Sequence, residues 1–247
     1  MIERITGIVL DTVKHSDRHN VVTLFTRERG RMSFLSPAGK GKSGLMRNAR
    51  LMPLSVVTAD INIHANRELQ VLPTPQRAAV WHDLYFNPVK SSVAIFLSEF
   101  LNAYLRHSEA DSNEWDFIFR SVESLDSARR GMANLHLAFL IGLLPFAGIE
   151  PDLSGAGEGR WFDMRGGCFT PFPPPHGDSL RPEEARLLPL LSRMTAANSR
   201  AFRFSAAQRR RLLAGLLQYY SVHFPGLANL KSPSILTEVF ASPGGGE

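Results

Sequence analysis

This sequence of 247 residues has almost no cysteine, no long apolar run and no leader-like pattern in its first residues. Cys168 is its single cysteine, which excludes a disulfide framework and a metal cage made only of cysteines. No run of about 18 apolar residues occurs, so no membrane-spanning helix is expected. The first 15 residues mix charged and apolar side chains, unlike a signal peptide. We therefore expect a soluble, cytoplasmic protein without a membrane partner.

Motifs for covalent chemistry are also missing. GKGKS at residues 39–43 resembles a phosphate-binding loop, but the first glycine of that motif would fall at Ser36. The eight histidines are scattered, and none has the spacing of a metal ligand with Cys168 or with another histidine. His136 lies in an apolar segment, which predicts a core histidine. We expect no enzyme activity, no cofactor and no metal.

The positive charge is concentrated in one part of the chain. Residues 1–77 carry a net charge of +6, whereas residues 78–247 carry −1. Within residues 27–50 the net charge is again +6, and a basic segment of this density attracts polyanions. A solvated basic surface without a partner is the alternative. The candidate residues for binding a nucleic acid are Arg27, Arg29, Arg31, Lys40, Lys42, Arg47 and Arg50.

Aromatic residues are scarce in residues 1–77, where Phe25 and Phe34 are the only two. Proteins that bind single strands usually combine basic residues with aromatic side chains that stack on bases. Because at least one of these phenylalanines is expected in the core, we predict contacts to the sugar-phosphate backbone rather than to bases. Binding would then depend weakly on sequence and strongly on salt.

The first 77 residues have the pattern of a small β-barrel. Residues 5–13 are rich in β-branched side chains, which predicts a strand, and we expect further extended stretches over residues 21–26, 31–35, 51–63 and 68–72. Residues 27–30 form a hairpin loop in which Gly30 can take a positive φ. Residues 36–44 (SPAGKGKSG) are small and basic, which predicts a mobile loop. Five short strands without a long helix favour a closed barrel.

From about residue 80 the apolar spacing becomes helical. It predicts helices over residues 88–107, 112–126, 132–147, 182–194 and 205–224, and a short one near 232–240. Residues 149–179 are rich in glycine and proline, so we expect an irregular insertion or a small β-excursion there. The sequence thus predicts an α+β chain with a β-domain at 1–77, a helical domain at 78–241 and a disordered tail at 242–247.

Three consecutive arginines lead the predicted helix at residues 205–224. They cannot all point the same way, because successive helical residues lie on different sides. The functional interpretation of Arg209, Arg210 and Arg211 is a docking site for an acidic peptide or for phosphates. The alternative is a solvated first turn.

In the order of its segments the chain resembles the RecO family of bacterial DNA repair and recombination mediators. TGIVLDTVKHSDRHNVVTLFTRERGRMSFLSPAGKGKSG, from residue 6, resembles the family's opening strand, hairpin and glycine-lysine loop. LMPLSVVTADINIHANRELQVL, from residue 51, resembles the next strands. LAFLIGLLPFAGIEPDL, from residue 137, resembles the central helix and its exit.

The resemblance implies a five-stranded oligonucleotide-binding (OB) fold followed by a helical domain. It also implies work in the RecF pathway near the nucleoid: binding single- and double-stranded DNA, annealing complementary strands, and loading recombinase onto strands coated with single-strand binding protein (SSB). RecR and the acidic tail of SSB would be partners. Many members carry a four-cysteine zinc site, but residues 152–175 hold only Cys168, so this chain resembles a zinc-less form held by packing of Trp161, Phe162 and Phe169. A non-catalytic protein-interaction scaffold that does not bind DNA is the rival interpretation.

Overall fold

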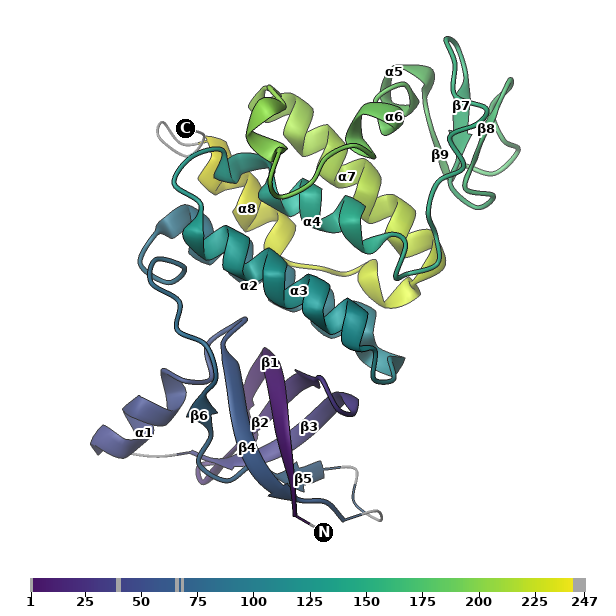
Figure 1. Cartoon of the computed structure of the whole chain (residues 1–247). Coiled ribbons are helices and arrows are strands. Elements are labelled where there is room, and N and C mark those ends of the chain that lie inside the picture. Colours follow the sequence, from purple (N-terminus) through teal and green to yellow (C-terminus); the bar gives the residue numbers. More distant parts are fainter. Residues whose placement is uncertain (1, 39–40, 65–66, 68, 242–247) are drawn as a thin grey trace. The chain divides into compact units, whose positions relative to one another are not determined.

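The computed structural model describes residues 2–38, 41–64, 67 and 69–241, and it divides the chain between Ser127 and Ala128 into two compact units (Figure 1). The expected class, a β-rich region followed by a helical region, is confirmed. The first unit contains all the strands of the larger sheet and also the first two long helices. The sequence predicted two domains, 1–77 and 78–241, with the boundary placed where the strand pattern changes to a helix pattern. These limits stay a prediction.

The larger sheet has six strands rather than five. In the order β5-β3-β2-β1-β4-β6, neighbours are antiparallel except β3 and β5, which are parallel. The closed barrel predicted from the strand count is therefore wrong: within the described residues, the two-residue strand β6 occupies the free edge of β4, and the sheet stays open. A partly open barrel is typical of the OB fold. The strands are β1 (Ile2–Lys14), β2 (His19–Thr26), β3 (Gly30–Pro37), β4 (Val56–Asn62), β5 (Leu69–Val71) and β6 (Gln76–Arg77).

Both faces of β1 are buried in their middle part. Ile5 and Val9 belong to the apolar core inside the curved sheet, and Ile8, on the opposite face, is equally inaccessible. The outer face is covered by α2 (Pro88–Tyr104), and α3 (Ser112–Ser127) packs beside α2 and donates the indole N–H of Trp115 to the carbonyl of Phe25 in β2. The Ser98 hydroxyl of α2 donates to the carbonyl of Leu10. This packing explains why the first unit reaches beyond the strands.

The connection between β3 and β4 departs most from the prediction. A helix, α1 (Gly41–Asn48), begins inside the segment predicted to be a mobile loop. Gly44 is buried, and Leu51 is part of the core inside the sheet. The burial of this side compensates for the poor helix propensity of glycine. Figure 1 shows α1 beside β6 at the edge of the sheet. The extended stretch predicted from residue 51 begins only at Val56.

The second unit is mainly helical. Its central helix carries His136, which is 1% exposed; burial, reinforced by Arg209, lowers the pKa of His136 to about 3, so it is a neutral core residue as expected. None of the described helices is long and apolar enough to cross a bilayer. The elements are α4 (Leu135–Leu143), β7 (Trp161–Asp163), β8 (Cys168–Thr170), β9 (Ser179–Leu180), α5 (Pro182–Ala185), α6 (Leu188–Leu191), α7 (Ala206–His223) and α8 (Ser232–Ala241), with short 3₁₀ turns at 105–107 in the first unit and at 132–134, 199–201 and 225–227 in the second.

Two expectations for this unit need correction or detail. The prediction of a single helix over residues 182–194 is wrong, because the segment forms two short helices, α5 and α6. Pro189 lies in the first turn of α6, and since proline has no backbone N–H, it cannot continue the preceding helix. The insertion predicted at 149–179 contains most of the small sheet β8-β7-β9. The tail predicted at 242–247 lies outside the described residues.

Candidate nucleic-acid interface

The predicted basic segment separates into two groups near opposite ends of β3. Arg27 and Arg29 lie in the hairpin before Gly30, where β3 begins, whereas Arg47 donates to the carbonyl of Pro37, where β3 ends, at 3.2 Å. A strand of eight residues spans about 23 Å. The structure therefore does not bring the predicted arginines into one tight cluster. We call Arg27, Arg29 and Arg31 the hairpin arginines. Arg47 lies in α1, and Arg50 and Arg77 lie next to it; we call these three the α1 arginines.

Two of the hairpin arginines are held by carboxylates. Arg27 forms an ion pair of 3.2 Å with Asp116 of α3 and lies over the ring of Trp115, 5.4 Å from its centroid. Arg29 forms an ion pair of 2.8 Å with Glu3 of β1. The hydrogen bond and the charge of Glu3 raise the pKa of Arg29. A phosphate would have to compete with these carboxylates.

The third hairpin arginine is part of the interior of the first unit. Arg31 is half-buried, and its guanidinium donates to the Asn102 side chain of α2 at 3.0 Å. Burial lowers the pKa of Arg31, and the positive charge of Arg106 lowers it further, while Asp11 opposes the shift. Arg31 therefore joins the sheet to α2 rather than presenting its charge to a ligand.

The hairpin itself forms as predicted. Gly30 has φ +67°, which glycine adopts without strain. A side chain there would also collide with the backbone of Glu109, 2.6 Å from the position of a Cβ. The close approach fixes the arginine-bearing loop against the first unit's own helical layer.

The α1 arginines have different partners. Arg47 donates to the Pro37 carbonyl and, at 3.4 Å, to the Thr74 hydroxyl. Arg50 donates to the carbonyl of Pro75 at 2.8 Å, and Arg77 to that of Ala49 at 3.4 Å. These acceptors are neutral, and within the described part of the chain none of the three arginines forms an ion pair. Their charges are therefore uncompensated while their side chains are held in place.

An open groove of about 570 Å³ lies between α1 and the segment that ends in β6. Two α1 arginines line it together with an exposed methionine and uncharged polar side chains, so its surface is positive with an apolar patch. Sequence reasoning missed Arg77, which lies 27 residues beyond the basic segment and reaches it by the pairing of β6 with β4. The lining residues are Met46, Ala49, Arg50, Thr74, Gln76 and Arg77.

The two predicted lysines are not placed by the structure. Lys40 lies outside the described residues. Lys42 belongs to α1, but its side chain is outside the described part. Their contact with DNA stays a prediction.

Both phenylalanines of the β-region are core residues. Phe25 and Phe34 are 0% exposed, so neither can stack on a base. This agrees with the expected lack of aromatic stacking in this region.

The three arginines of α7 do not all point the same way, as expected: Arg209 and Arg210 line one small pocket, and Arg211 lines another. Ser205 and Gln208 form a capping box that starts the helix just before them. Arg209 donates to the carbonyl of Phe204 and lies over the ring of Phe240, and burial lowers its pKa. Arg210 is exposed beside it. Arg211 instead lines a cavity on the other side of α7.

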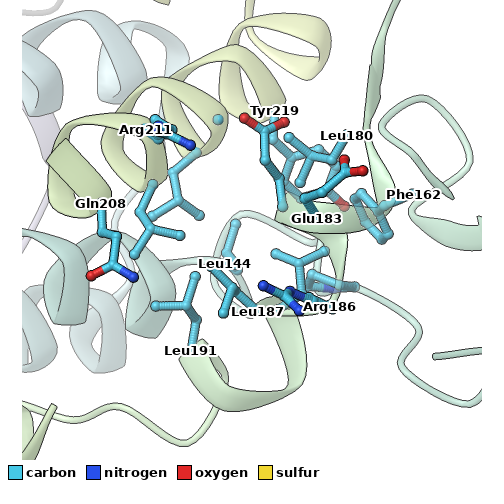
Figure 2. A pocket seen from close by; sticks show the side chains of 16 residues that line it. Leu144, Phe162, Leu180, Glu183, Arg186, Leu187, Leu191, Gln208, Arg211 and Tyr219 are labelled. Atoms are coloured by element: carbon cyan, nitrogen blue, oxygen red, sulfur yellow. The ribbon is translucent and has the colours of Figure 1, made fainter. Parts of the chain in front are cut away.

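This cavity, of about 170 Å³, lies within the second unit and is mainly apolar. Figure 2 shows Leu144, Leu187 and Leu191 in its wall, with Gln208 and Arg211 on the α7 side. Glu183, Glu184 and Arg186 also line it, so its polar groups have mixed charge. It can accept an apolar group of a ligand whose polar part meets these charged residues.

The insertion is held by aromatic packing. The rings of Phe162 and Phe169 are 5.3 Å apart, and Phe162 also meets Tyr219 of α7 at 5.4 Å. Phe162 is fully buried. Among the residues that the structure describes, no group of three or more His, Cys, Asp or Glu side chains is arranged to hold a metal ion.

Comparisons with known proteins agree across nearly the whole chain. Residues 1–75 match the family model described as Recombination protein O N terminal, and residues 85–233 match Recombination protein O C terminal. A DNA repair protein RecO from Porphyromonas gingivalis is 38% identical over 238 residues, which cover 95% of this chain and 97% of that protein. Another from Phocaeicola vulgatus is 33% identical over 241 residues, covering 98% and 100%.

Proposed function

This chain belongs to the RecO family of DNA repair proteins, and we propose that it binds single- and double-stranded DNA through the α1 arginines and anneals complementary strands. The observation that supports this use of the first unit is the set of three arginines with neutral partners beside an open groove. Arginines held by carbonyls keep their full charge for a phosphate, and the release of counterions from DNA then drives binding.

Annealing follows from charge alone in this proposal. Two complementary strands repel each other because every nucleotide carries a negative charge. Phosphates neutralised by the α1 arginines would let a second strand approach with less repulsion, and base pairing would complete the reaction. No covalent bond is made or broken, so the protein acts without enzyme activity or a cofactor. It would do so in the cytoplasm, on the nucleoid.

The test is a titration of labelled single-stranded and duplex oligonucleotides at several salt concentrations, paired with an annealing assay. We expect affinity that falls steeply with salt and annealing that rises above the spontaneous rate. Salt-independent retention, or no retention at all, would favour the rival interpretation of a protein-interaction scaffold. Turnover of added nucleotide would contradict the proposal that the protein is not an enzyme.

We further propose that the chain works with RecR and the acidic tail of SSB in loading recombinase onto coated single strands. Family membership supports this step. The mainly apolar cavity beside Arg211 supports the peptide contact, because an apolar C-terminal side chain fits the leucines while Arg186 and Arg211 face the carboxylates. Glu183 and Glu184 limit how many acidic residues the rim accepts.

Titration with a synthetic acidic peptide that ends in phenylalanine tests the cavity. Leu187→Lys, at a partly buried wall residue, should abolish binding and Arg211→Ala should weaken it, whereas Arg210→Ala, which replaces an exposed neighbour outside this cavity, should leave it unchanged. Equal effects of the two arginine substitutions would place the peptide elsewhere on α7.

A further inference from the structure

The outer side of α1 is apolar and exposed, although its inner side is already packed. Gly44 faces the unit's interior, while Leu45 is 71% exposed and Met46 is 54% exposed. Two large apolar side chains on a helix of eight residues therefore face solvent next to a row of uncompensated arginines.

The groove places one of these apolar residues beside the charges. Met46 lies in the last turn of α1, Arg50 lies in the turn that follows the helix, and both line the groove with Arg77. Leu45 precedes Met46 in the same helical turn, and its carbonyl accepts the N–H of Ala49, another residue of the groove. The surface thus offers anion-binding and apolar contacts side by side.

A single nucleic-acid strand has this combination of properties, since it carries a phosphate at each nucleotide and exposes unstacked bases with apolar faces. In a duplex the base faces are covered by stacking, and a protein meets phosphates and groove edges instead. Among polyanions, the apolar residues can therefore gain contact with bases only in the single strand.

We propose that Leu45 and Met46 contact the bases of a single strand whose phosphates are held by the α1 arginines, so that this surface prefers single-stranded to duplex DNA. This inference rests on the proposed DNA-binding function of the same groove. It adds a base contact that the scarcity of aromatic residues did not predict, made by aliphatic side chains rather than rings.

The experiment compares full-length Leu45→Gln/Met46→Gln with the parent protein. Glutamine has nearly the helix propensity of leucine and methionine, so α1 is expected to persist, and circular dichroism checks this. The probes are a labelled oligothymidylate of about 20 nucleotides, which exceeds a typical site for one OB fold, and a duplex of the same length. Ile95→Gln on α2, where Ile95 is 47% exposed, is the matched control.

We expect the double variant to bind the single strand about tenfold more weakly, a loss near the lower end of one base-stacking contact. Duplex affinity should change by less than about twofold, because the phosphate contacts remain. For each probe, the variant should have the same salt slope as the parent. The control should resemble the parent with both probes.

Equal losses on the two probes, or no loss on either, would overturn the inference. A parallel variant, Arg50→Ala/Arg77→Ala, separates this failure from that of the proposed function. If the arginine variant flattens the salt slope while the glutamine variant binds normally, only the base contact is wrong. If the arginine variant leaves the slope unchanged, the groove is not the DNA site and both proposals fail.

Discussion

The hairpin arginines and the α1 arginines carry the same charge, but they differ in their partners. Arg27 and Arg29 are paired with carboxylates, and Arg31 is half-buried against α2. The α1 arginines donate to carbonyl and hydroxyl oxygens. The net charge of a sequence segment therefore counts all of its basic residues, whereas the charge available to a ligand depends on what each side chain already contacts.

The difference has an energetic reason. A phosphate that binds Arg27 or Arg29 replaces a carboxylate, and the freed carboxylate then repels the nucleic acid. A phosphate that binds Arg50 meets a guanidinium whose donors are only partly used, and nothing negative is released. Counterion release should thus be larger, per arginine, at the α1 groove.

The largest expected effect comes from removing the α1 arginines together. Arg47→Ala/Arg50→Ala/Arg77→Ala should flatten the salt dependence of single-strand binding by about two units, since each phosphate contact contributes about 0.7. At 0.1 M salt this corresponds to a loss of about a hundredfold in affinity relative to the high-salt limit. Fluorescence anisotropy over a series of salt concentrations measures the slope. A slope within about half a unit of the parent's would remove these arginines from the interface.

Asp126 is the opposite case, because its charged side chain is bound by other groups of the protein. Its carboxylate accepts backbone N–H groups of His82, Asp83 and Leu84 at 2.9, 2.8 and 2.7 Å. Burial opposes its ionisation, but these bonds, together with the charge of Lys90, lower the pKa of Asp126 below its usual value. The segment that leads from β6 to α2 is therefore fixed by one ionised side chain.

Asp126→Asn should destabilise the protein at neutral pH by about 2 kcal/mol, because a neutral amide oxygen accepts these bonds more weakly. A lowered folded-state pKa contributes stability at pH values above the unfolded pKa of about 3.9, and this contribution is lost as the pH falls through the folded value. Urea unfolding over a series of pH values should show a difference from the parent that is largest at pH 7 and shrinks as the pH falls below about 3.9. A pH-independent difference would contradict the ionised state of Asp126.

Much of the fold could be predicted from the sequence because its signals are local. β-Branched residues predicted β1 and β2, a short apolar stretch after the hairpin loop predicted β3, and helical apolar spacing predicted α7. The loop prediction for residues 36–44 failed because α1 depends on burial of Gly44 and Leu51 against strands distant in sequence. With two residues, β6 is too short to produce a pattern.

The candidate site was less predictable for a related reason. Sequence spacing identified seven basic residues, but it could not show that Arg27 finds Asp116, 89 positions away, or that Arg29 finds Glu3. Sequence spacing also could not show that Arg77 lies next to α1, because this position depends on the pairing of β6 with β4. Ion pairing is a tertiary property, so the charge pattern alone overestimates the contribution of the hairpin.

Neutralising the two carboxylates should make the hairpin arginines more like the α1 arginines. Glu3→Gln/Asp116→Asn frees both guanidinium groups, and we expect the salt slope to steepen by about one unit, with affinity near 0.1 M salt rising about tenfold. The control is Asp17→Asn/Asp60→Asn, which changes net charge equally but acts on exposed pairs with Lys14 and Arg4. An equal gain in the control would mean that net charge, rather than the release of Arg27 and Arg29, sets the affinity.

The smallest expected effects come from single substitutions, and the two groups should differ in the salt slope. Arg27→Ala removes a partly exposed ion pair and a ring contact, so it should cost about 0.5–1 kcal/mol of stability while changing DNA affinity by less than about twofold. Arg50→Ala removes the hydrogen bond to the Pro75 carbonyl, so it should cost about 1 kcal/mol of stability, but it should also flatten the salt slope by about 0.7. Urea unfolding and the salt titration, measured on the same two variants, give both quantities. If Arg27→Ala flattened the slope as much as Arg50→Ala, the carboxylate partner would not withhold the arginine from DNA, and the two groups would form one interface.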